Sequence, residues 1–244
     1  QDPNPLVAGQ GLKRLQDSGI EVESGVMEAQ ARALNPGFVK RMETGLPYVR
    51  VKLAMSLDGR TAMASGESQW ISGDAARQDV QFLRARSAAV LTGIGTLLSD
   101  NPSMNVRLSA EDFDVDEVRP PLRVVLDSAL RFPADAKMLE HEGEVLVLTA
   151  SKNATENAAY QIEQVAEKNG KIDLEAALKL LAEKEINEIH VEAGAVLCGA
   201  LLQQKLVDEI IIYMAPHIMG DEARGLFSLP VLSEMKNRIS LDIQ

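Results

Sequence analysis

Short runs of apolar residues alternate with segments of helical periodicity along most of the chain. The runs are rich in Val, Ile and Leu and predict buried strands at 49–55, 88–92, 122–126, 145–149, 188–192 and 209–214. Apolar residues at three- and four-residue spacing predict helices after residue 72, after residue 173 and at 195–204. This alternation predicts an α/β fold, with a mostly parallel sheet covered by helices on both faces.

Polar residues and glycines mark the ends of these elements. Ser72 and Asp173 stand directly before helical segments and are expected to be N-caps. The stretch from Gly93 to Ser99 is expected to be a glycine turn with exposed backbone. Asp100 follows it and precedes an Asn-Pro step, which disfavours helix.

The two ends of the chain follow weaker patterns. Leu12 and Leu15 suggest a short helix, 20–22 a short strand, and 27–34 a second helix that ends at an Asn-Pro-Gly step. Residues 239–244 alternate in polarity and predict a strand cut off in mid-pattern. Because the chain also begins without methionine, we expect it to be part of a longer protein.

Four separated motifs carry a resemblance to a known family. They are KLAMSLDGR at 52–60, GESQWI at 66–71, DNP at 100–102 and VEAG at 191–194. In this order and spacing they resemble the reductase half of the bifunctional riboflavin-biosynthesis deaminase/reductase. The resemblance covers nearly the whole chain and is specific, because all four motifs agree.

The resemblance implies both a fold and a reaction. A dihydrofolate-reductase-like domain is expected at 47–244, with its last strand missing, after a remnant of the deaminase domain and linker at 1–46. The reaction is the NADPH-dependent reduction of 5-amino-6-(5-phosphoribosylamino)uracil to the ribitylamino compound, by hydride transfer to ribose C1. The deaminase's His-x-Glu and Pro-Cys-x-x-Cys zinc motifs are absent from this sequence. Zinc is therefore expected only in a domain that this chain lacks.

Carried over position by position, the resemblance also assigns roles to residues. It implies substrate contacts at Ser68, Arg84, Met104, Arg107 and Glu192, where the arginines hold the ribose phosphate by forked, charge-assisted hydrogen bonds. It implies cofactor contacts at Ala54, Trp70, Thr96, Asp100, Ser128, Gly194, Ala195, Val196, Leu197, Cys198, Gly199 and Ala200. Catalytic roles are implied for Lys52, Asp100 and Glu192.

The residues themselves leave alternatives open at these positions. Asp100 or Glu192 would move the proton that opens the ribosylamine if burial raises its pKa, or would only orient the substrate. Alternatively, Asp100 is a turn residue whose side chain accepts a hydrogen bond from the nearby backbone. Gly194 and Gly199 are compatible with a pyrophosphate bound at a helix N-terminus. They form no Gly-x-Gly-x-x-Gly pattern, however, so the alternative is that they only turn the chain and let the helix pack on the sheet. Trp70 also reads as core filling.

Charge and composition narrow the range of partners. The net charge of −11 argues against nucleic acid and anionic membranes. Phosphorylated ligands then need a local positive island, for which the motifs offer Lys52, Arg60, Arg77, Arg84 and Arg107; solvated surface cations are the alternative. The single cysteine, Cys198, lies among apolar residues and is expected to be a buried thiol. No apolar run is long enough to span a bilayer, so we expect a cytoplasmic protein.

Three readings of function come from different classes. One is a reductase of the same fold that acts on another substrate, such as a pterin. The second is a non-catalytic nucleotide-binding module. The third is a bifunctional enzyme of which this chain is one part. A homodimer is also expected, from the resemblance and from the apolar run at 210–214.

Overall fold

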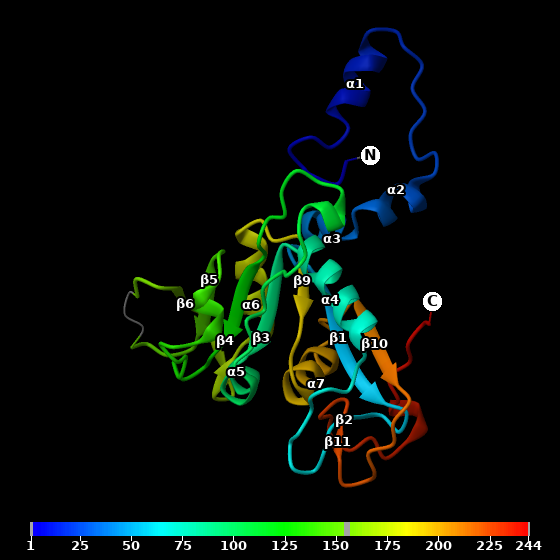
Figure 1. Ribbon diagram of the computed structural model, residues 1–244. Coiled ribbons are helices and arrows are strands. Elements are labelled where there is room, and N and C mark those ends of the chain that lie inside the picture. Colours follow the sequence, from blue (N-terminus) through cyan, green and yellow to red (C-terminus); the bar gives the residue numbers. More distant parts are fainter. Residues whose placement is uncertain (1, 154–156, 244) are drawn as a thin grey trace.

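A parallel sheet forms the centre of the molecule (Figure 1). The computed structural model describes residues 2–153 and 157–243, and within them one sheet has seven strands in the order β10-β1-β9-β3-β4-β5-β6. All neighbouring pairs in it are parallel. Its strands are β1 (Tyr48–Ser56), β3 (Ala89–Gly93), β4 (Leu122–Leu126), β5 (Val145–Thr149), β6 (Gln161–Gln164), β9 (Glu188–Val191) and β10 (Glu209–Ala215).

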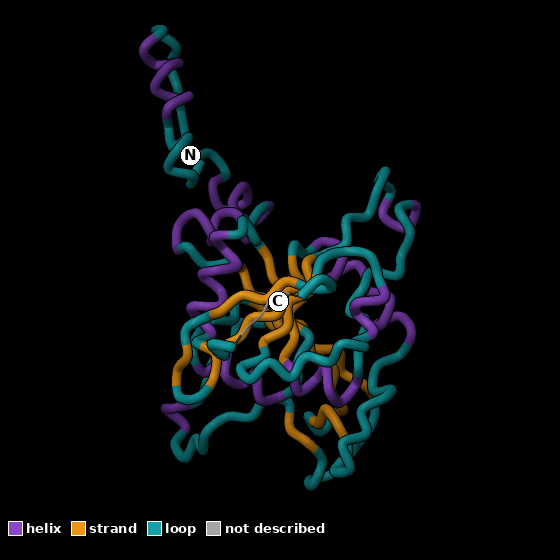
Figure 2. The backbone as a smooth tube through the Cα atoms, turned by 90° about the vertical axis from the view of Figure 1, so that its left-hand side faces the viewer, coloured by secondary structure: helices purple, strands orange, loops and turns teal. Residues whose placement is uncertain are grey.

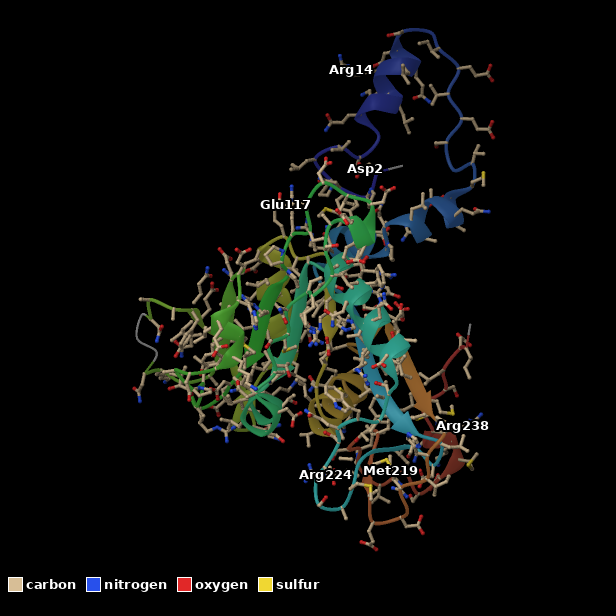
Figure 3. All side chains as sticks on the ribbon, in the orientation of Figure 1. Asp2, Arg14, Glu117, Met219, Arg224 and Arg238 are labelled. Atoms are coloured by element: carbon tan, nitrogen blue, oxygen red, sulfur yellow. The ribbon has the colours of Figure 1, made fainter. Side chains whose placement is uncertain are left out.

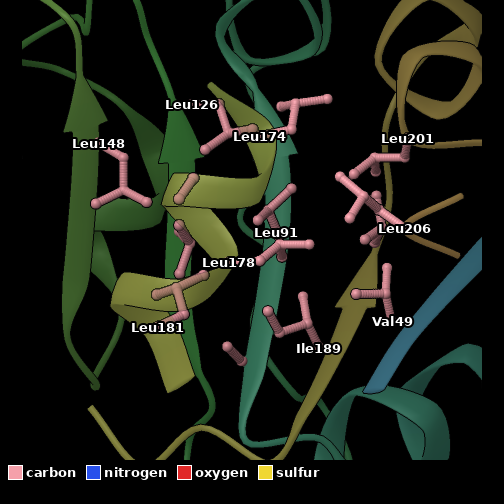
Figure 4. Close-up of a cluster of buried hydrophobic side chains, with 14 of the residues drawn as sticks. Val49, Leu91, Leu126, Leu148, Leu174, Leu178, Leu181, Ile189, Leu201 and Leu206 are labelled. Atoms are coloured by element: carbon pink, nitrogen blue, oxygen red, sulfur yellow. The ribbon is translucent and has the colours of Figure 1, made fainter. Parts of the chain in front are cut away.

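Helices cover both faces of this sheet, which confirms the predicted architecture. Alternate strand residues such as Val51 and Leu91 pack against α6 (Leu174–Glu183) and α7 (Ala195–Gln203). Figure 4 shows part of this larger core, with Leu174, Leu178 and Leu181 of α6 beside strand residues such as Leu91 and Leu126. On the opposite face, α5 (Ile94–Asp100) packs in the second core, and α4 (Asp74–Arg86) is tied to the sheet by polar side chains.

Short elements decorate the edges of the sheet. β2 (Arg60–Ala62) pairs antiparallel with β11 (Arg224–Gly225), and β7 (Glu167–Lys168) pairs antiparallel with β8 (Lys171–Ile172). Single 3-10 turns occur at η1 (Glu111–Phe113), η2 (Lys137–Glu140) and η3 (Met235–Asn237). None of the helices in the described ranges is long and apolar enough to cross a membrane.

The N-terminal segment extends away from the sheet (Figures 1 and 2). It contains α1 (Gln10–Asp17) and α2 (Glu28–Leu34), neither of which buries a residue. The next helix, α3 (Pro36–Thr44), does pack on the domain, because Arg41 Nε donates to Asn187 Oδ1 at 2.6 Å. The division of the chain at residues 46 and 47 stays a prediction.

Several local predictions at the chain ends are wrong. Residues 20–22 form no strand, and neither do the described residues of the 239–244 stretch, which have no neighbouring strand to pair with. The Asn-Pro-Gly step at 35–37 does not only end a helix but also begins α3, because proline is well suited to the first helical position.

Helix starts around the sheet are partly as predicted. Asp173 is the N-cap of α6, and its carboxylate accepts from the amides of Glu175 and Ala176. Ser72 is not the N-cap of α4; Gly73 occupies that position, and the Ser72 carbonyl accepts from Arg77 instead. The expected glycine turn after β3 is the helix α5, since burial of Ile94 and Leu97 outweighs the low helix propensity of glycine.

Candidate functional site

A cleft of about 1780 Å³ opens at the carboxyl ends of β1, β3, β4 and β9. Open parallel sheets commonly bind ligands at this edge, where loops and helix N-termini converge. The strands contribute Lys52 and Ala54 from the middle and second half of β1, Gly93 from the end of β3 and Leu126 from the end of β4, and Glu192 directly follows β9.

The cleft gathers nearly all of the residues that the sequence singled out. Its lining includes Lys52, Ala54, Ser68, Trp70, Arg84, Thr96, Asp100, Met104, Arg107, Ser128, Glu192, Gly194, Ala195, Val196, Leu197 and Ala200. These positions come from separate parts of the chain and are brought together only by the fold. Cys198 and Gly199 are exceptions, because they do not line the cleft.

Arg84 and Glu192 form a forked ion pair in the cleft wall. Arg84 Nε donates to Glu192 Oε1 at 2.5 Å, and Nη2 donates to Oε2 at 3.0 Å. Arg84 Nη1 donates to the carbonyl of Asn105 at 2.8 Å. Both side chains are largely withdrawn from solvent, with 10% and 17% of their surface exposed. The fork expected to hold a ribose phosphate is therefore directed at Glu192, which corrects the simple picture of Arg84 as a free phosphate ligand.

The ion pair also decides the protonation of Glu192. Burial alone would raise the pKa of this carboxyl, but the charge and hydrogen bonds of Arg84, with His190 nearby, hold it well below its usual range. The condition for proton transfer by Glu192, a pKa raised by burial, is therefore not met, and the alternative that Glu192 only orients the substrate remains. Glu192 is a fixed negative charge and not a proton donor near neutral pH.

Lys52 is a cation of a different kind. Desolvation lowers the pKa of its ammonium group, and Arg84 lowers it further, while Glu192 opposes both. Within the described ranges, Lys52 has no side-chain ion pair, and its Nζ lies 5.6 Å from the centroid of the Tyr213 ring. Its three donors are therefore free to face a ligand in the cleft.

His190 is a buried neighbour of this group that was assigned no role from the sequence. It lies on β9 with no exposed surface, and its Nε2 is 3.4 Å from Glu192 Oε1 without hydrogen-bond geometry. The hydroxyl of Thr92 is also buried without a partner among the described residues. The alternation of β9 places His190 and Glu192 on one face, and this periodicity was the available signal.

The segment after α5 carries Asp100, Met104 and Arg107 along the cleft. Asp100 ends α5 and is exposed. Among the hydrogen bonds of the described residues there is none in which its carboxylate accepts from a nearby backbone amide, as the side chain of a turn residue would. Met104 is buried, and the amide of Arg107 donates to Gln81 Oε1 at 3.0 Å. The Gln81 contact thus fixes the backbone from which the exposed Arg107 side chain extends.

Trp70 stands at the mouth of the cleft. It is 69% exposed, so the alternative reading of core filling is wrong. The guanidinium of Arg77 lies over its ring, 4.8 Å from the centroid, and donates to the Ser72 carbonyl at 2.6 Å. The stacking presents an aromatic face beside the cleft, which suits a flat heterocycle.

The start of α7 forms another part of the lining. Gly194 is the N-cap, and the first-turn residues Ala195, Val196 and Leu197 all face the cleft. A Cβ at Gly194 would meet nothing nearer than Thr96 Oγ1 at 4.0 Å, so the backbone here is open to a ligand. Free amides at a helix N-terminus bind phosphate well. These residues fit the pyrophosphate of a dinucleotide.

Cys198 and Gly199 face the interior and correct the expectation of cofactor contacts there. A Cβ at Gly199 would lie 2.3 Å from the carbonyl oxygen of Ser228, so this glycine serves chain packing. Cys198 is fully buried, and burial raises its pKa to about 12. It is the inert thiol that its apolar sequence context predicts.

The lining of the cleft is positive although the protein is negative. Its cations are Lys52, Arg77, Arg84, Arg107, Arg131, Lys137, Lys168, Lys171 and Arg224, against the carboxylates Asp100, Asp173 and Glu192. Figure 3 shows Arg224 at the end of the molecule where β2 and β11 lie. Arg60 is not in this lining; it contacts Asp221 and the Ala223 carbonyl. Among the described residues, no group of three or more His, Cys, Asp or Glu side chains is placed to hold a metal.

A doubly covered parallel sheet with a charged cleft at its carboxyl edge defines an α/β protein whose candidate ligand site lies at that edge. The family model described as "RibD C-terminal domain" matches residues 47–242. The chain therefore belongs to the RibD C-terminal domain family, the reductase domain of riboflavin biosynthesis.

Individual relatives agree with this family. Riboflavin biosynthesis protein RibD of Escherichia coli is 46% identical over 96% of this chain, and that of Haemophilus influenzae is also 46% identical. The chain spans only 66% and 64% of the length of these two proteins.

Solved structures give the same result. Acinetobacter baumannii RibD, form 1, has a TM-score of 0.86 and 46% identity over 99% of this chain and 67% of its own. A diaminohydroxyphosphoribosylaminopyrimidine deaminase/5-amino-6-(5-phosphoribosylamino)uracil reductase from Thermotoga maritima has a TM-score of 0.81 and 31% identity, over 98% of this chain and 63% of its own.

Proposed function

We propose that this chain reduces 5-amino-6-(5-phosphoribosylamino)uracil to 5-amino-6-(5-phosphoribitylamino)uracil with NADPH. The observation that carries the proposal is the convergence of the predicted substrate and cofactor residues on one positive cleft. The similarity to the Thermotoga maritima protein, a reductase of this substrate by name, supports the same choice. A pterin reductase, the main alternative, would need cations for the phosphates of NADPH but none for a substrate phosphate.

The reaction breaks the bond between C1 and the ring oxygen of the ribose and forms a C1–H bond. NADPH supplies the hydride, and one proton must reach the ring oxygen as the ring opens. Lys52 is the group best suited to deliver that proton, because its ammonium is unpaired among the described residues and its pKa is lowered by burial. The Glu192 carboxylate and Arg84 fix the charge around it.

The remaining residues bind and orient. Arg107, with Ser68, would take the ribose phosphate. Asp100 would lie near C1, where its exposed carboxylate favours the positive charge that develops on the opening ribosylamine. Trp70 and Thr96 would contact NADPH, and the first turn of α7 would take its pyrophosphate.

An oxidation assay tests the proposal. The purified chain is mixed with NADPH and the ribosylaminouracil phosphate, and NADPH absorbance is followed beside samples that contain the dephosphorylated substrate or dihydrofolate. Rapid oxidation is expected only with the phosphorylated ribosylaminouracil. Oxidation with dihydrofolate alone would assign a pterin reductase, and NADPH binding without oxidation by any substrate would indicate a binding module.

We propose further that the chain forms a homodimer through β10. This edge strand presents Ile212 and Met214 with 39% and 58% of their surface exposed, and an exposed apolar edge strand can pair with another chain. Sedimentation at micromolar concentration should give twice the 26.5 kDa mass of the chain, and a 26.5 kDa species alone would contradict it. A cytoplasmic location, and zinc-dependent deamination by a longer protein that carries this chain, are part of the same proposal.

A further inference from the structure

Lys52 lies between two polar links that join α4 to the sheet. In the strand order β10-β1-β9, Lys52 is on the middle strand β1. On one side, Arg84 of α4 bonds Glu192 at the end of β9. On the other side, the Tyr213 hydroxyl of β10 donates to Asp79 Oδ2 of α4 at 2.5 Å. Only the first link contains residues with an expected role.

The second link places an aromatic ring against the lysine. Tyr213 pairs in register with Ala54, the next residue of β1 on the face that carries Lys52. The Lys52 Nζ lies 5.6 Å from the ring centroid, within the range of a cation–π contact. The bond to Asp79 fixes the far end of the ring, so the ring cannot turn away from the ammonium group.

Tyr213 and Asp79 do not themselves line the cleft, whereas Lys52 does. A lysine side chain has a flexible stem of four carbons and must be held to donate in one direction. An ion pair with a carboxylate would hold it but would occupy its donors. An aromatic face restricts the stem and leaves the three N–H groups to the ligand.

We propose that Tyr213, anchored by Asp79, is a positioning residue that holds the Lys52 ammonium toward the substrate. The proposal rests on the proposed function, because it needs Lys52 to act on the substrate. It differs from a purely structural tie between α4 and the edge strand. A structural tie would affect every function of the domain, whereas a positioning residue acts through Lys52 alone.

A double-mutant cycle tests this difference. Tyr213→Leu should lower kcat on the order of tenfold to a hundredfold, the scale of a misplaced catalytic group, with little change in NADPH Kd or in the unfolding midpoint. In the Lys52→Met background, the same substitution should leave the residual kcat unchanged. Tyr213→Phe keeps the ring but loses the bond to Asp79, and should give a smaller loss in the same direction. An equal loss of kcat in both backgrounds would overturn the proposal.

A second readout does not depend on activity. In protein with 13C-labelled lysine, the ε-CH2 signal of Lys52, assigned by its loss in Lys52→Arg, should be shifted by the ring current of Tyr213. Tyr213→Leu should move it to the position of an ordinary lysine, and an unmoved signal would overturn the proposal. If the signal responds but the unsubstituted chain never oxidises NADPH, it is the proposed function that fails and not the contact.

Discussion

Gly194 is the N-cap of α7 and Gly199 lies within that helix, yet a side chain added to each would meet opposite surroundings. At Gly194 the new Cβ would face the cleft, with Thr96 Oγ1 4.0 Å away. At Gly199 it would lie 2.3 Å from the Ser228 carbonyl oxygen. One glycine opens the cleft, and the other lets the chain after β11 pack on the helix.

This contrast gives a matched pair of alanine substitutions. Gly199→Ala should destabilise the fold by about 1–3 kcal/mol, as overpacking of a closed interior does. Gly194→Ala should leave the unfolding midpoint unchanged and weaken NADPH binding roughly tenfold, since a methyl group would separate the phosphate from an amide. Urea unfolding and NADPH titration measure the two effects. Unaltered NADPH affinity in Gly194→Ala would remove this turn from the cofactor site.

The Arg84–Glu192 pair should be important for stability as well as for the site. Arg84→Ala leaves the Glu192 carboxylate largely buried without its partner, which should cost about 3 kcal/mol in the free energy of unfolding. The double variant Arg84→Ala/Glu192→Gln has no unpaired charge and should recover part of that loss. Urea unfolding measures both, and equal stability of the single and double variants would contradict a role for the charge.

The same pair predicts a pH dependence. The folded-state pKa of Glu192 lies below its ordinary value of 4.5, so its stabilising effect is complete above pH 4.5 and is lost as the pH falls toward the folded-state pKa. The stability difference between the unsubstituted chain and Glu192→Gln should thus be constant above about pH 5 and shrink below it. A difference that grew on acidification would reverse the sign and contradict the pairing.

The substitution Asp100→Asn distinguishes a catalytic role of Asp100 from a role in forming the turn. The side chain is exposed at the end of α5, so the unfolding midpoint should barely move. If the carboxylate stabilises the opening ribosylamine, turnover should fall on the order of 100-fold while NADPH still binds. Steady-state kinetics and thermal unfolding test this together. A parallel loss of turnover and stability would assign Asp100 to the fold.

Arg107 should determine recognition of the substrate phosphate. Arg107→Ala should weaken substrate binding by about 1.5–3 kcal/mol, the loss of a charged hydrogen bond, and should affect NADPH much less. Arg86→Ala is the control, because Arg86 is exposed on α4 and does not line the cleft. Weaker NADPH binding with unchanged substrate binding would mean that the two ligands lie the other way round.

Much of the centre of the sheet could be predicted from sequence because its central strands are buried on both faces. The runs at 122–126 and 145–149 coincide with β4 and β5, since an uninterrupted apolar run between polar turns fits a central parallel strand. By contrast, β2 and β11 are short and polar, and they exist only because they pair with each other. Local patterns cannot predict such a ladder.

The site could be predicted as a set of residues but not as a set of contacts. The family resemblance implied that Arg84 and Glu192 share one site, whereas their mutual bonds depend on how α4 crosses the end of β9. The same crossing sets the low pKa of Glu192 and the link between Asp79 and Tyr213. The spacing of Gly194 and Gly199 did not show which of them faces a ligand, for a related reason. The surroundings of each glycine come from distant segments, Thr96 beside Gly194 and Ser228 beside Gly199.

The most direct test of the proposed reaction follows the hydrogen that NADPH transfers to the substrate. The chain is incubated with the ribosylaminouracil phosphate and NADPH that carries deuterium at the transferable position of C4, and the product is analysed by mass spectrometry and NMR. We expect a ribitylamino product with one deuterium, located at C1 of the former ribose. A product without deuterium, or with deuterium in the pyrimidine ring, would contradict the proposed reaction.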